Sequence, residues 1–302
     1  MSEFYKGEQR AWFHDEGHSA GFFHTYEALD VGGEPRKVQV FAPRDYEESG
    51  THYPVLYMND GDAAWEEGGA SGLSWQMAET LSELYHQNAI RKVIVVAVYP
   101  IDREKEYTHA PLSPRLLTPQ PSCCGVETYA NYLADKLKPF IDSCYRTLSQ
   151  PQETMIMGAS HGGLAAFYSA CRRPEQFGNA AALSPAFWIG LDGWLGAFRS
   201  LANSELLKLT ADTLADPAKR PRFWLDWGLL RNGGFHNQVI EGKTTKRGRE
   251  MAKLLRDRFG YLENEELFVF EDSQGEHSEA SWARRLPMVL KAFYGLESPV
   301  AA

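Results

Sequence analysis

The sequence is poor in cysteine and in uninterrupted apolar stretches. Four cysteines occur among 302 residues, and their spacing matches no metal-ligand pattern. No apolar run approaches the roughly 18 residues of a membrane span, and the first residues lack the basic-then-apolar form of a secretion signal. We therefore expect no membrane partner and free thiols in a reducing, cytoplasmic compartment. The adjacent Cys123 and Cys124 leave a vicinal disulfide as the alternative.

Positive charge is also scarce. The chain has 31 lysines and arginines against 40 aspartates and glutamates, which gives a formal net charge of −9. This balance argues against a nucleic acid or an anionic membrane as the main partner. Hydrophobic residues make up 43% of the chain, enough for a buried core in one large domain or two small ones. Without a repeat or a linker, we predict one domain over residues 1–302.

Strand-length and helix-length segments alternate along the chain, which favours the α/β class. Turn residues at 32–35 also predict a hairpin between the first two strands. The predicted strands span residues 21–29, 36–43, 53–58, 91–98, 154–157, 180–185, 222–228 and 266–271. The predicted helices span residues 75–85, 128–145, 164–170, 248–259 and 281–294. We therefore expect a mostly parallel central sheet of about eight strands with helices on both faces. Residues 1–35 would form an N-terminal extension and the first strand, and residues 188–215 a helical insertion near the site.

The segment Gly158-Ala159-Ser160-His161-Gly162-Gly163 follows an apolar strand and precedes a helix-like stretch. A serine at the apex of such a turn is typical of the nucleophile elbow of α/β-hydrolases. Side chains at Gly158 and Gly162 would collide with the neighbouring strand and helix. A Gly-rich turn carrying a solvated serine is the alternative, and the flanking strand and helix favour the elbow.

Several further segments resemble one known family, the "putative esterase" branch of the α/β-hydrolases. That branch includes enterochelin-esterase-like enzymes, esterase D, feruloyl esterases and mycolyltransferase antigens. The resemblance runs from about residue 36 to 295 and is specific for the family, not for a substrate. The matching segments are Asp60-Gly61, Arg103 with Glu106-Tyr107, Tyr132–Asp142, Tyr145–Thr147, the elbow, Arg173–Gly178, Leu183–Trp188, and Gly275–His277 with Trp282 and Arg285.

The elbow and the resemblance both identify Ser160 as the nucleophile, and chain order with the resemblance identifies His277 as the general base. The acid is less well defined, because relatives carry it about three residues after the equivalent of Gly228. This chain has Arg231 there. Glu241 in the same loop is the first candidate and Asp226 the alternative acid. A Ser–His dyad without an acid is the third possibility.

The resemblance also indicates an oxyanion hole made by the backbone N–H groups of His161 and Asp62. Relatives usually carry Leu or Met at position 161, so the His161 imidazole could face the substrate or pack against a loop. Trp188 and Trp194 could wall an acyl or aryl pocket. The expected substrate-binding residues are Arg103, Tyr107, Trp188 and His236.

These features predict a serine carboxylic-ester hydrolase that forms an acyl-enzyme on Ser160 and acts on a small-molecule ester. The chemistry needs no cofactor, and the sequence has no metal motif. One alternative is an acyltransferase of the same fold. Another is a non-catalytic descendant of such an esterase that binds a ligand. This alternative remains because Arg231 stands where relatives usually carry the acid. Siderophore, feruloyl, short acyl and thioester substrates all fit the family, and the sequence does not specify an oligomeric state.

Overall fold

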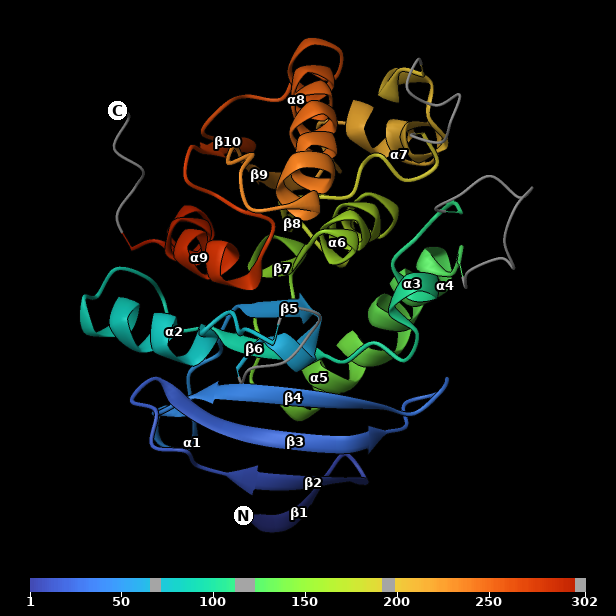
Figure 1. Ribbon diagram of the computed structural model, residues 1–302. Coiled ribbons are helices and arrows are strands. Elements are labelled where there is room, and N and C mark those ends of the chain that lie inside the picture. Colours follow the sequence, from blue (N-terminus) through green and yellow to red (C-terminus); the bar gives the residue numbers. More distant parts are fainter. Residues whose placement is uncertain (66–71, 112–122, 192–198, 297–302) are drawn as a thin grey trace. The chain divides into compact units, whose positions relative to one another are not determined.

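The computed structural model describes residues 1–65, 72–111, 123–191 and 199–296 (Figure 1). The chain groups into two compact units, each built from separate stretches of sequence. The first unit comprises Met1–Pro100, Tyr132–Met155 and Ser278–Ala302, and the second comprises Ile101–Asn131 and Ile156–His277. The single domain of the sequence analysis stays a prediction.

Antiparallel strands dominate the first unit. Its strands follow the order β1-β2-β3-β4-β6-β5, and only β5 and β6 pair in parallel. The hairpin predicted from residues 32–35 is confirmed, and β3 and β4 have the predicted bounds. The strands are β1 (Ser2–Lys6), β2 (Gln9–His14), β3 (Gly21–Leu29), β4 (Arg36–Pro43), β5 (Val55–Asn59) and β6 (Ile94–Val98).

The helices of the first unit include two that pack against each other, α2 and α9. The Trp75 and Trp282 rings lie 5.7 Å apart beside them. The helical elements are α1 (Tyr46–Ser49), η1 (Gly61–Ala63), α2 (Met77–His86), η2 (Leu133–Leu137), α5 (Lys138–Cys144), η3 (Pro151–Glu153) and α9 (Glu279–Tyr294).

The long helix predicted over residues 128–145 is divided into three segments. The helix α4 (Val126–Tyr132) leads into η2, a π-helical segment, and then into α5. Pro139 lies at the start of α5 and has no N–H to donate to a carbonyl four residues earlier. A local π-helical turn is one way for a helix to absorb such a missing bond.

The second unit contains four strands in the order β7-β8-β9-β10. The strands β8, β9 and β10 run parallel, so their carboxyl ends lie on one edge. Loops that leave such an edge are where α/β proteins place their sites. The strands are β7 (Thr154–Ala159), whose first two residues group with the first unit, β8 (Asn179–Leu183), β9 (Arg222–Gly228) and β10 (Leu267–Asp272).

Helices of the second unit pack on these strands, with α6 against β8 and α8 against β9. Gly248 lets α8 approach β9, because a Cβ there would lie 2.3 Å from the Trp227 ring. The helical elements are α3 (Arg103–Glu106), α4, α6 (His161–Arg172), η5 (Leu201–Asn203), α7 (Glu205–Ala215), η6 (His236–Ile240) and α8 (Glu241–Asp257). The predicted helical insertion at 188–215 thus contains η5 and α7, whereas Trp194 lies outside the described residues.

The strand number requires a correction. The described residues contain ten strands rather than about eight, because the unassigned N-terminal residues form β1 and β2. Their mixed polar and aromatic composition fits a pair with a single buried residue, Ala11 of β2. The expected parallel pairing holds for β5–β6, β8–β9 and β9–β10. The pairs β1–β2, β2–β3, β3–β4 and β4–β6 are antiparallel.

The prediction of four free thiols is also wrong. Cys123 and Cys124 form a disulfide just before α4, and Cys124 has a positive φ of 71°. The bridge thus coincides with a left-handed backbone conformation that a sequence pattern does not reveal. Cys144 and the buried Cys171 are free. The cytoplasmic location stays a prediction. The argument for it from four free thiols no longer applies, because two of the cysteines are joined. None of the described helices combines the length and the hydropathy that a bilayer crossing requires.

Candidate active site

Ser160 occupies a sharp turn between β7 and α6, as the elbow motif predicts. Its backbone has φ 54° and ψ −121°, a region that non-glycine residues rarely adopt. Two backbone hydrogen bonds hold this conformation. The Ser160 N–H donates to the Leu183 carbonyl over 3.0 Å, and the Ala186 N–H donates to the Ser160 carbonyl over 2.9 Å. The end of β8 therefore fixes the serine.

The helix after the serine is buried on all sides from Gly162 to Cys171. Its start lies so close to the sheet that a Cβ at Gly163 would sit 3.1 Å from the carbonyl oxygens of Gly158 and Leu183. Close approach of backbones is a common reason for glycine in such turns. The similar role expected of Gly158 and Gly162 stays a prediction.

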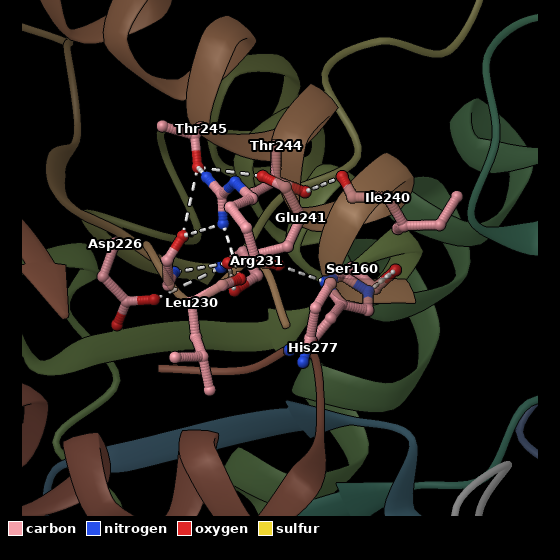
Figure 2. Close-up of polar contacts among 12 residues, drawn as sticks. Ser160, Asp226, Leu230, Arg231, Ile240, Glu241, Thr244, Thr245 and His277 are labelled. Atoms are coloured by element: carbon pink, nitrogen blue, oxygen red, sulfur yellow. Dashed lines mark hydrogen bonds and ion pairs between the residues drawn. The ribbon is translucent and has the colours of Figure 1, made fainter. Parts of the chain in front are cut away.

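His277 connects Ser160 to a carboxylate. Its Nε2 lies 3.0 Å from Ser160 Oγ, and its Nδ1 lies 2.5 Å from Glu241 Oε2. The His277 side chain is 5% exposed and that of Glu241 is fully buried. The three side chains thus form a continuous line from hydroxyl to imidazole to carboxylate (Figure 2).

Glu241 is the first residue of α8 and follows directly on the π-helical segment η6. Its second oxygen, Oε1, accepts a hydrogen bond from Ser184 Oγ over 3.0 Å and another from the Gly228 N–H. A buried carboxylate is tolerated when its oxygens are hydrogen-bonded in this way. The carboxylate is therefore held on one side and presented to His277 on the other.

The loop that carries His277 is bound to the chain that follows β9. The Leu229 N–H donates to the Asp272 carbonyl, and the Leu230 N–H donates to the Gly275 carbonyl. Gly228 permits this contact, because a Cβ there would lie 2.2 Å from the Gly275 oxygen. The Asn237 side chain adds an acceptor for the His277 backbone N–H at 3.1 Å.

Asp226, the alternative acid, has different partners. Its carboxylate accepts hydrogen bonds from Trp224 Nε1 at 2.8 Å and from the Ser184 N–H at 3.2 Å. Among the candidate acids, the geometry favours Glu241, because its oxygen contacts His277.

Arg231 stands where the family resemblance led us to expect the acid, and its side chain bonds the nearby backbone. Its guanidinium donates to the carbonyls of Gly228 and Leu230 and to Thr245 Oγ1. The Thr245 hydroxyl also lies within hydrogen-bonding distance of the carbonyl of Glu241, the residue at the start of its own helix. Figure 2 shows this cluster beside Glu241. Arg231 thus connects the end of β9 to the first turn of α8.

The expected substrate-binding residues differ in exposure. His236 is exposed, with its ring 6.1 Å from the His277 ring, so it stays a candidate contact. Tyr107 is fully buried between the Tyr129 ring and the Arg103 guanidinium, which favours a bracing role for it. Trp188 is 7% exposed and lies after β8.

The two expected oxyanion donors lie in different units. His161 begins α6, so its backbone N–H is among those with no acceptor in their own helix. Asp62 lies in η1 of the first unit, and its role as a donor stays a prediction. In the part of the chain that the structure describes, no group of three or more His, Cys, Asp or Glu side chains is arranged to hold a metal.

Sequence reasoning missed three supporting residues. Ser184 and Asn237 hold Glu241 and His277, and Glu104 contacts the imidazole of His161 at 3.3 Å. Ser184 has a positive φ of 41°. It follows a strand and precedes a proline, and this position in the sequence is a weak signal for an unusual turn. Nothing in the sequence pattern singles out Asn237 or Glu104.

Comparisons with known proteins agree with this architecture. The family model described as "Putative esterase" matches residues 31–293. The uncharacterized protein YbbA of Bacillus subtilis is 25% identical over 156 residues, which are 51% of this chain and 58% of that protein. The siderophore triacetylfusarinine C esterase of Aspergillus fumigatus is 27% identical over 164 residues, 52% of this chain and 53% of that protein. The matches therefore span little more than half the length of these relatives.

A solved structure shows the same fold at lower identity. The IroE-like serine hydrolase from Shewanella oneidensis has a TM-score of 0.65 and 18% identity, over 89% of this chain and 79% of that one. This likeness confirms the predicted α/β-hydrolase fold. Because the family model covers most of the sequence, the chain belongs to the esterase family that this model describes.

Proposed function

We propose that the protein is a serine carboxylic-ester hydrolase. The observation that carries the proposal is the line from Ser160 Oγ through His277 to the buried Glu241 carboxylate. A serine hydroxyl becomes nucleophilic at neutral pH when a base removes its proton. The carboxylate on Nδ1 holds the imidazole in the tautomer that leaves Nε2 free to act as that base.

In the first half of the reaction, Ser160 Oγ attacks the ester carbonyl and His277 Nε2 takes the hydroxyl proton. The carbonyl oxygen becomes an anion, which the His161 backbone N–H would stabilise. The C–O bond to the alcohol then breaks, and His277 returns the proton to the departing alkoxide. The acyl group stays on Ser160.

In the second half, water attacks the acyl-enzyme carbonyl while His277 accepts a proton from it. The bond to Ser160 breaks, the carboxylic acid leaves, and the proton returns to the serine oxygen. Glu241 stays ionised and stabilises the imidazolium that forms in each half.

The substrate would be a small-molecule ester. The Aspergillus fumigatus relative is named for the siderophore triacetylfusarinine C, so siderophore esters belong in a first screen. Short p-nitrophenyl esters and feruloyl esters complete that screen. Liquid chromatography with mass spectrometry would detect the released acids.

The direct test compares the unmodified protein with Ser160→Ala. We expect turnover of p-nitrophenyl butyrate, covalent labelling of Ser160 by a fluorophosphonate, and a loss of kcat of at least ~10³-fold in the variant. The matched control is Ser143→Ala, which removes an exposed serine of α5 and should keep both properties. A folded Ser160→Ala protein with normal turnover would refute the proposal.

A further inference from the structure

A second imidazole–carboxylate pair lies directly after the nucleophile. His161 is the residue next to Ser160, and its Nδ1 lies 3.3 Å from Glu104 Oε1. The imidazole is 12% exposed, and its Nδ1 is buried and meets Glu104 at an ion-pair distance without a hydrogen bond. The other ring nitrogen, Nε2, lies across the ring from Nδ1 and so does not contact the Glu104 carboxylate. Neither residue has a part in the proposed Ser160–His277–Glu241 line.

Glu104 places negative charge against this ring. The neighbouring His161 imidazole holds the pKa of the Glu104 carboxyl below its usual range, so the group is ionised at neutral pH. Its other oxygen, Oε2, is buried without a hydrogen-bond partner among the described residues. Buried polar atoms without partners are rare in folded proteins. The anion beside Nδ1 favours the tautomer with its proton there, which leaves a lone pair on Nε2.

Hydrogen bonds hold Glu104 in place. The Thr108 hydroxyl donates to the Glu104 carbonyl at 2.6 Å, and the Asp102 side chain caps α3 by accepting from the Lys105 N–H. The Cys124 N–H in turn donates to Thr108 Oγ1 at 3.3 Å. The carboxylate therefore reaches His161 from a hydrogen-bonded stretch of backbone.

We propose that His161 is a specificity-determining residue whose Nε2 accepts a hydrogen bond from the substrate, with Glu104 as its positioning residue. This inference rests on the proposed function. The His161 N–H would face the ester oxygen, so the side chain of the same residue lies within a few ångströms of the reacting carbonyl. A hydroxyl or amide N–H on the carbon next to that carbonyl is within its reach.

The favoured substrates are therefore esters of hydroxy acids or N-acylated amino acids rather than plain alkanoic esters. The Leu or Met that the family resemblance leads us to expect at this position has no comparable acceptor. The Nε2 lone pair can accept a hydrogen bond from a donor on the substrate, whereas a hydrocarbon side chain cannot. The enzyme would therefore bind substrates with that donor better than substrates without it.

The test uses two esters that differ in one donor, the p-nitrophenyl esters of N-acetylglycine and N-acetylsarcosine. We expect the unmodified protein to prefer the N–H ester by about 3- to 10-fold in kcat/KM, the range of one hydrogen bond. In His161→Leu the ratio should fall to about 1, and His161→Gln should restore part of it through its amide oxygen. Glu104→Gln should reduce the ratio by raising KM for the N–H ester only.

The control is His52→Leu, which removes an exposed histidine of the first unit and should keep the full ratio. Fluorophosphonate labelling of Ser160 in every variant reports the serine chemistry separately from the preference. Equal kcat/KM for both esters in the unmodified protein, or an unchanged ratio in His161→Leu, overturns the inference. An unmodified protein that neither labels nor turns over either ester contradicts the proposed function, and the inference falls with it.

Discussion

Two buried carboxylates lie near the carboxyl end of β9, and they differ in what they hold. Asp226 and Glu241 are both 0% exposed, and both accept a hydrogen bond from Ser184. Asp226 receives its other bond from Trp224, a residue of its own strand. Glu241 turns its second oxygen to His277, which lies 36 residues further along the chain. Burial alone therefore does not identify an acid of the site, whereas the set of partners does.

The difference follows from secondary structure. Trp224 and Asp226 are two residues apart on a strand, so their side chains lie on the same face and meet locally. Glu241 lies where η6 continues into α8, so its direction depends on how these helical turns pack. Asp226 thus bonds a neighbour on its own strand and the backbone after β8, whereas Glu241 joins the end of β8, the end of β9 and His277.

The largest effect should come from the carboxylate that contacts His277. We expect Glu241→Gln to lower kcat by about 10³–10⁴-fold, because an amide no longer favours the imidazole tautomer needed by the base; comparable changes in other serine hydrolases have this size. Steady-state kinetics with p-nitrophenyl butyrate would measure it. Asp226→Asn is the matched control and should retain kcat within a few-fold. Equal losses in both variants would refute the distinction.

The same comparison can be made between imidazoles. His277 contacts a carboxylate, whereas His109 Nδ1 is buried with no hydrogen-bond partner among the described residues. Burial lowers the pKa of His109 to about 4 from its ordinary 6.5. The unfolded chain therefore binds a proton more readily than the native state, and stability present above pH 6.5 is lost as the pH falls toward 4. This loss amounts to about 3 kcal/mol.

Urea unfolding of the unmodified protein and His109→Asn between pH 7 and pH 4 would measure that loss. The difference in the free energy of unfolding between the two proteins should change across this window. Burial also lowers the pKa of His24, to about 3, but that contribution is common to both proteins. A difference that does not vary with pH would contradict the expectation.

A smaller effect is expected for stability when Asp226 is changed. Asp226→Asn replaces one acceptor oxygen with an N–H₂ group that must face Trp224 Nε1–H or the Ser184 N–H. We expect a loss of about 1–3 kcal/mol in the free energy of unfolding, the usual consequence of a buried donor left without its acceptor. Thermal unfolding followed by circular dichroism would detect it. A neutral result would show that the pocket rearranges around the amide.

The smallest effect should come from Ser184→Ala. This change removes the hydroxyl bond to Glu241 Oε1 but leaves the Gly228 N–H bond and the His277 contact in place. We expect kcat to fall by about 3- to 10-fold, in keeping with one hydrogen bond. A lower kcat at an unchanged KM in Ser184→Ala would show that Ser184 acts through Glu241. A fall as large as that of Glu241→Gln would place Ser184 closer to the chemistry.

Local pattern anticipated several elements in detail. The strand at 222–228 and the hairpin of β3 and β4 have the predicted bounds, because alternating or continuous apolar residues and turn residues are local signals. The helix α8 begins at Glu241 rather than at 248, since its first turns are polar and carry no apolar stripe. The strands β1 and β2 were not predicted, because their mixed polar and aromatic residues show no regular alternation.

The candidate site likewise has a part that the sequence predicted and a part that it could not predict. The turn at Ser160 is a short motif and was identified from the sequence together with His277, although their roles are proposals. The choice between Glu241 and Asp226 could not be made there, because both are acidic residues near one strand end. Arg231 shows the limit most clearly, since its guanidinium serves a backbone connection that no spacing predicts.

The sequence by itself determined the strand–serine–helix turn, the order of the elements and the absence of long apolar runs. These depend on neighbours within a few residues, where propensity and sterics act directly. Only the tertiary structure decided which carboxylate contacts His277, that Cys123 and Cys124 are joined, and that Glu104 lies against His161. Each of the two side-chain pairings joins groups 36 or more residues apart, and the disulfide coincides with a left-handed backbone residue. Packing and the need to satisfy buried polar groups fix such contacts, and neither is written in a local pattern.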